Sequence, residues 1–272
     1  MPPILPGLPE ISVKTVGQRG TMATAVAHAS NPAKPSVGLP GRRYDHLFFP
    51  AMALLMLATV FVGFARTYYF AGVFHAPLPS LIIHLHGAAF SCWILLLVTQ
   101  ASLVSAGRVD IHRRLGIAGM VLACVMVIVG VLAATDLLVR GTGPPGRDPK
   151  FFYIIPMSDM VIFATLIFFA FRARSNPPVH KRLILIATTA LLIAPIARLR
   201  FPLTYRNPIR VALVTYIFLL ILAAYDLWST RKVYRVTLWA GAFLIFVQQV
   251  RIPIGKTAAW HAFASWVQSI AR

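Results

Sequence analysis

Seven long apolar stretches fill most of the chain between Leu47 and Ile254, and they limit the possible folds more than any other feature. A helix needs about 20 mostly apolar residues to cross the hydrocarbon of a bilayer, because only an internally hydrogen-bonded backbone is stable there. We therefore predict an all-α fold, a helical membrane bundle of about seven transmembrane helices. The predicted spans are residues 47–65, 81–104, 115–135, 151–171, 179–198, 211–228 and 236–252.

The charge balance is strongly basic, with 26 Lys and Arg against 7 Asp and Glu and a formal net charge of +19. In a soluble protein this excess would suggest a nucleic-acid partner. Here 58% of the residues are hydrophobic and the basic ones lie at the ends of the spans. We therefore predict a lipid bilayer with anionic headgroups as the partner, and no nucleic acid.

The chain divides into three regions. Residues 1–43 are rich in Pro, Gly, Ala and Ser and are predicted to form a disordered N-terminal tail. Residues 44–255 form the predicted transmembrane domain. Residues 256–272 are predicted to form an amphipathic helix in the membrane interface, because Trp260, Phe263, Val267 and Ile270 share one helical face.

The basic residues also predict an orientation. The tail and the turns on its side of the membrane hold about 15 Lys and Arg, and the other side holds about 11. By the positive-inside rule, this favours a multi-pass membrane protein with a cytoplasmic N-terminus and an external C-terminus.

Two similar segments open spans from the same side of the membrane: His112-Arg113-Arg114-Leu115 and His180-Lys181-Arg182-Leu183. They are interpreted either as basic anchors at the membrane surface or as a cofactor site. In the second interpretation His112 and His180 are axial ligands of one b-type haem between the third and fifth spans, and the neighbouring basic residues lie near its propionates. Imidazoles at one depth on two facing helices are what a low-spin haem requires.

Polar residues gather toward the opposite end of the spans. Because successive spans alternate in direction, these residues fall in one outer third of the membrane, and ionisable groups there normally face a partner or a cavity. We predict a polar pocket in this region, with Asp159 most plausibly paired to Arg198 as a helix lock. The alternative is a ligand, proton or metal site. The predicted pocket residues are Arg66, Asp136, Asp159, Arg198, Gln248 and Arg251.

His84 and His86 begin the second span. Residues two apart on a regular helix point about 200° apart, so one histidine is expected to face the pocket and the other the interface. Gly87 would leave room there for a bulky planar group. Both histidines are candidate cofactor ligands, and the alternative is a hydrogen-bonded structural role.

The order of these motifs resembles a family of uncharacterised bacterial polytopic membrane proteins. The resemblance covers roughly residues 45–255 and rests on His84-Leu85-His86-Gly87, Trp93, Gln100, His112-Arg113-Arg114-Leu115-Gly116 and His180-Lys181-Arg182-Leu183. The resemblance implies the bacterial inner (cytoplasmic) membrane as the location, and no particular activity. The chain is also loosely similar to di-haem b-type cytochromes and ferric reductases. It departs from them because no single helix carries two histidines about one membrane thickness apart.

Three functions stay open on the sequence. The best supported is a b-haem-binding or redox-associated membrane protein. The first alternative is a protein that binds or transports a small molecule or lipid through the outer polar pocket. The second is a membrane-embedded metal hydrolase with His84, His86 and His261 as ligands and Asp136 or Asp159 positioning water.

Overall fold

The computed structural model describes residues 44–76, 80–143, 146–199 and 208–271, all of which belong to one compact unit, Gly38–Arg272. The predicted disordered tail, residues 1–43, lies outside the described residues. The described residues form helices and no strands, which confirms the all-α prediction. In chain order the elements are α1 Asp45–Phe64, the π-helix η2 Ala65–Tyr69, α2 Leu81–Ser105, α3 Val109–Val139, α4 Pro149–Arg172, α5 Pro177–Leu191, α6 Ile193–Arg198, α7 Pro208–Thr230, α8 Arg235–Gly255 and α9 Ala258–Ile270.

Seven helical segments within the described residues are long and apolar enough to cross a membrane. They are α1 with η2, α2, α3, α4, α5 with α6, α7 and α8, and they match the seven predicted spans. The chain is therefore a polytopic integral membrane protein.

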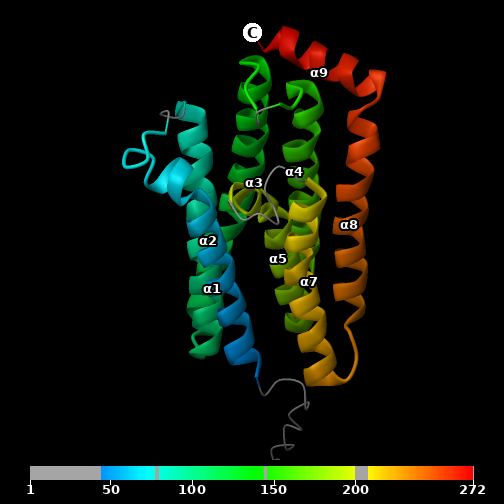
Figure 1. Ribbon diagram of the computed structural model, residues 1–272. Helices are drawn as coiled ribbons and strands as arrows, with labels where there is room; N and C mark the ends of the chain where they lie inside the picture. The colour runs from blue at the N-terminus through cyan, green and yellow to red at the C-terminus, as the bar shows by residue number, and fades with distance from the viewer. Residues whose placement is uncertain (1–43, 77–79, 144–145, 200–207, 272) are drawn as a thin grey trace, which may run out of the picture. The chain divides into compact units, whose positions relative to one another are not determined.

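The long helices run side by side and alternate in direction (Figure 1). We call the end at which α1, α3, α5 and α8 begin the histidine end, and the other, where α9 lies across the bundle, the α9 end. Helix α5 is the most buried of the spans and contacts α4, α7 and α8. Residues on α5 are therefore surrounded by other helices, whereas those on α7 have a side that lipid can reach.

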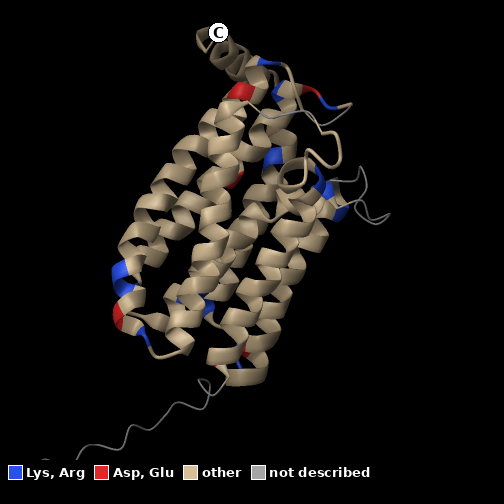
Figure 2. Ribbon diagram, turned by 90° about the vertical axis from the view of Figure 1, so that its left-hand side faces the viewer, with Lys and Arg blue, Asp and Glu red and all other residues tan. Residues whose placement is uncertain are grey.

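Charged residues are concentrated toward the two ends of the bundle, and the middle is almost free of them (Figure 2). Between the ends, large apolar side chains such as Leu132, Phe168 and Leu220 are exposed on the outside of the helices. A bilayer would cover this surface, whereas a soluble protein rarely exposes so much contiguous apolar area.

Local sequence signals set the starts of α4 and α9. The Asp148 carboxylate accepts hydrogen bonds from the backbone N–H groups of Lys150 and Phe151, and Pro149 occupies the first turn, where its missing N–H costs nothing. The Thr257 hydroxyl accepts from the N–H of Trp260 in the same way. These caps end the connecting loops at defined positions.

Helix α9 packs one face against the bundle. Its inner face is fixed on the ends of α3 and α4: Trp260 Nε1 donates to Lys150 O at 2.8 Å and Gln268 Nε2 to Leu138 O at 2.9 Å. Ala264 is fully buried in this contact, and Trp266 and Ile270 stay exposed. That this exposed face lies in the membrane interface remains a prediction.

Candidate functional site

The structure brings His112 and His180 together at the histidine end. Each histidine lies in the first turn of its helix, α3 or α5, and the two ring centroids are 6.4 Å apart with planes at 85°. The sequence predicted that they lie at the same depth, and the fold adds that they face each other. We call these two residues the histidine pair.

A backbone carbonyl fixes the orientation and tautomer of one member of the pair. His180 Nδ1 lies 2.8 Å from the carbonyl oxygen of Ala170 on α4. A carbonyl only accepts hydrogen bonds, so Nδ1 carries the proton and Nε2 keeps its lone pair. This is the arrangement that orients metal-binding histidines in proteins.

Gln100 of α2 holds the other member. Its amide fits its neighbours when the nitrogen donates to His112 Nδ1 at 2.7 Å and the oxygen accepts from the N–H of Gly116 at 3.0 Å. In that state His112 carries its proton on Nε2. If the amide turns over, Gln100 Oε1 accepts from Nδ1–H and Nε2 becomes free, so the rotation of Gln100 is coupled to the tautomer of His112. The sequence had placed Gln100 in a motif without giving it a role.

The basic residues that follow His180 are already paired. Lys181 Nζ donates to Asp45 Oδ2 at 2.5 Å, and the other oxygen of this carboxylate accepts from the Tyr225 hydroxyl at 2.7 Å. Arg182 is buried and donates to Asp226 Oδ1 through Nε at 3.0 Å and through Nη2 at 2.5 Å. The suggestion that Lys181 or Arg182 neutralises haem propionates is therefore not supported. Arg113 and Arg114 are exposed beside His112.

Asp226 was missed by the sequence interpretation, although a lone carboxylate near the end of an apolar span was a usable signal. Its second oxygen accepts from the Thr237 hydroxyl at 2.7 Å and from the N–H of Tyr234 at 3.2 Å. The Arg182 guanidinium also stacks on the Tyr234 ring, 3.6 Å from its centroid. All charges and lone pairs named here are satisfied, so this buried ion pair ties α5, α7 and α8 together at the histidine end.

Toward the α9 end, the ion-pair partner of Asp159 is Arg251 and not the predicted Arg198. Arg251 Nη1 donates to Asp159 Oδ1 at 2.7 Å and to the Ser158 hydroxyl at 3.1 Å. Gln248 lies one helical turn before Arg251 on the same face of α8. All three predicted residues Asp159, Gln248 and Arg251 are buried, and with Ser158 we call them the Asp159 cluster.

The other predicted pocket residues have separate contacts. Arg198 lies 4.7 Å from the centroid of the Phe64 ring and donates to the carbonyl of Ala194, and it forms no salt bridge to an acid of the described residues. The guanidinium of Arg66 stacks over Phe74 in a similar way. Asp136 forms an ion pair with Arg140 and accepts from the Ser80 hydroxyl at 3.0 Å. Of the six predicted pocket residues, only Asp159, Gln248 and Arg251 share contacts with one another.

His84 and His86 lie in different surroundings, as the helical spacing predicted. His84 is exposed, with its ring 5.8 Å from that of Tyr68. His86 is half-buried against Phe90, with ring centroids 4.1 Å apart, and its Nδ1 has no hydrogen-bond partner among the described residues. The space that Gly87 leaves is filled by the Tyr68 ring, since a Cβ at residue 87 would lie 2.5 Å from Tyr68 Cζ.

The ligand set suggested for a metal hydrolase is not assembled. No group of three or more His, Cys, Asp or Glu side chains within the described ranges is placed to hold a metal ion. His261 is the suggested third ligand. Its Nδ1 lies 3.6 Å from Asp148 Oδ2, and its Nε2 lies 3.1 Å from the carbonyl oxygen of Gly255.

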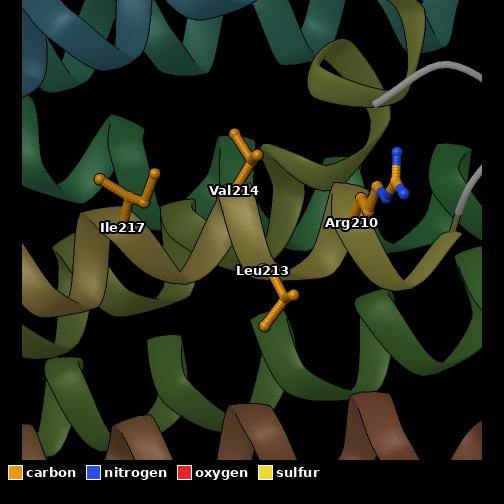
Figure 3. A pocket seen from close by; sticks show the side chains of 4 residues that line it. All are labelled: Arg210, Leu213, Val214 and Ile217. Carbon is orange, nitrogen blue, oxygen red and sulfur yellow. The ribbon is translucent and has the colours of Figure 1, made fainter. Parts of the chain in front are cut away.

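A groove of about 210 Å³ runs along one side of α7. Figure 3 shows its four lining side chains, Arg210, Leu213, Val214 and Ile217, arranged along that helix. Its lining is almost wholly apolar and contains none of the predicted site residues. In a bilayer, acyl chains fill such a groove on a lipid-facing helix.

No family model, curated protein or solved structure matches this chain. The resemblance to a family of bacterial membrane proteins stays a prediction, and the function has to be argued from the histidine pair and the Asp159 cluster.

Proposed function

We propose that this protein is a membrane-bound redox protein in which His112 and His180 ligate the iron of one b-type haem. The separation of the rings carries the proposal. Metal–nitrogen bonds of about 2 Å on each side of a metal atom place two opposed imidazole centroids roughly 6 Å apart. The observed value is 6.4 Å. A direct edge-to-face contact between the two rings has the same spacing and is the alternative that the experiment below distinguishes.

The surroundings of His180 support the proposal. His180 offers its Nε2 lone pair because Ala170 O holds Nδ1–H. Ligation by His112 through Nε2 requires the Gln100 amide to turn over, so that its oxygen accepts from Nδ1–H and gives up the contact that it makes with the Gly116 N–H. Arg113 and Arg114 are exposed at the start of α3 and would hold the propionates. A haem iron with two histidine ligands supplies one-electron transfer, and the protein's residues set its position and its polar surroundings.

The visible spectrum of the purified protein, oxidised and reduced, tests the proposal. Wild-type protein from haem-replete cells is expected to show a Soret band, and His112→Ala and His180→Ala should each abolish it or shift it strongly, because each removes an axial ligand. His84→Ala is the matched control and should leave the spectrum unchanged. Conversion of His112 and His180 to Arg separates the two interpretations, since basic anchors tolerate it and iron ligands do not. A colourless wild-type protein would refute the haem proposal.

A further inference from the structure

The Asp159 cluster contains buried polar atoms that have no hydrogen-bond partner. Gln248 is only 2% exposed, and its amide is close enough to the Asp159 carboxylate to interact with it, yet neither amide atom forms a hydrogen bond of normal geometry within the described residues. Arg251 is 5% exposed, and its Nε is also without a partner there. Both residues lie on one face of α8, one turn apart, against α4.

Such atoms are costly in a membrane protein. A buried polar group without a hydrogen bond destabilises the fold, and lipid cannot supply the missing partner. Natural proteins satisfy nearly all their buried polar groups, with ordered water where protein partners are lacking. Three such atoms on two neighbouring residues therefore indicate that another molecule binds here.

The charges and hydrogen-bonding atoms of the cluster define what can bind. The Arg251 charge is neutralised by Asp159 at 2.7 Å, so the site is neutral and an ion would enter without a counter-charge. The atoms to be satisfied are two kinds of donor, Arg251 Nε–H and the Gln248 amide nitrogen, and one acceptor, the Gln248 amide oxygen. A hydroxyl group both accepts and donates.

We propose that the Asp159 cluster is a binding site for a neutral hydroxyl group within the membrane domain. The group belongs either to water or to a lipophilic alcohol or phenol, and both have the same hydrogen-bonding chemistry. This site is independent of the histidine pair, which lies at the other end of the bundle.

The cluster has polar neighbours on α7 and α8. Tyr216 is half-buried and close enough to Arg251 and Asp159 to interact with their charges. Its hydroxyl accepts from Gln249 Nε2 at 3.0 Å, and Gln249 is exposed. The Asp159 cluster therefore has a polar neighbour on α7 as well as its own residues on α4 and α8.

Thermal stability in detergent distinguishes an occupied site from an empty one. If a hydroxyl group bonds to Gln248, the apolar replacements Gln248→Leu and Gln248→Met leave that group and Arg251 Nε without a hydrogen-bond partner, and the midpoint should fall by roughly 2 to 4 °C. If nothing binds, both changes remove an unsatisfied amide and should raise the midpoint, which would overturn the proposal. Gln249→Leu is the control, because that side chain is exposed and already bonded to Tyr216.

A ligand titration then identifies the source of the hydroxyl group. Decylubiquinol serves as a lipophilic phenol. A rise in the midpoint of wild-type protein that is lost in Gln248→Leu would assign the site to an organic hydroxyl. No rise in the wild type, with Gln248→Leu still less stable, would assign it to water. The haem spectrum should be the same in all these variants, so failure of the haem proposal and failure of this one are separately visible.

Discussion

At the scale of single residues, the Asp159–Arg251 contact makes a measurable prediction. Removing one partner leaves a buried charge uncompensated, which typically costs about 3 to 5 kcal/mol, whereas replacing both with apolar residues of similar volume costs far less. Asp159→Asn and Arg251→Met should each lower the thermal midpoint in detergent by more than the double change does. Arg198→Met is the control, since Arg198 stacks on Phe64 and should not couple to Asp159. Simple addition of the two single effects would contradict the pairing.

At the scale of elements, the sharpest constraint is the crossing of α1 and α6. A Cβ at Gly63 would lie 2.4 Å from the carbonyl oxygen of Pro195, a backbone atom that cannot move aside cheaply. Gly63→Ala should therefore destabilise the protein by about 1 to 3 kcal/mol through overpacking. Gly241→Ala is the matched control within a helix, because its Cβ would meet only Leu219 at 3.8 Å and would gain helix propensity. Thermal unfolding of the two variants measures the difference, and equal midpoints would refute the close approach.

At the scale of the whole molecule, an odd number of spans predicts that the start of α1 and the end of α8 lie on opposite sides of the membrane. The excess of basic residues on the side of the tail predicts that this side is cytoplasmic. Reporter fusions at Gly107 and Asn176 should both report from the cytoplasm, and a fusion at the C-terminus should report from outside. A C-terminus on the same side as Gly107 would mean an even number of spans and would contradict the bundle.

The sequence predicted the spans closely because hydrophobicity is a local property that the bilayer selects directly. It also predicted depth: alternating spans place His112 with His180 at one end and Asp159 with Arg251 toward the other. Depth left two partners open for Asp159, because Arg198 and Arg251 both close spans on the same side. Which arginine pairs with Asp159 depends on which face of each helix contacts α4. The sequence of a strongly apolar span hardly indicates that face, since its lipid and protein neighbours are equally apolar.

The sequence by itself determined that this protein is an all-helical membrane bundle and where its seven spans lie, and it identified Asp159, Gln248 and Arg251 as polar residues within them, although it missed Asp226. Only the tertiary structure decided that the histidines face each other at 6.4 Å, that Gln100 and Ala170 hold their rings and that Tyr68 fills the space above Gly87. The physical reason is that the bilayer fixes how deep each residue lies, whereas close packing between helices fixes how each helix is rotated.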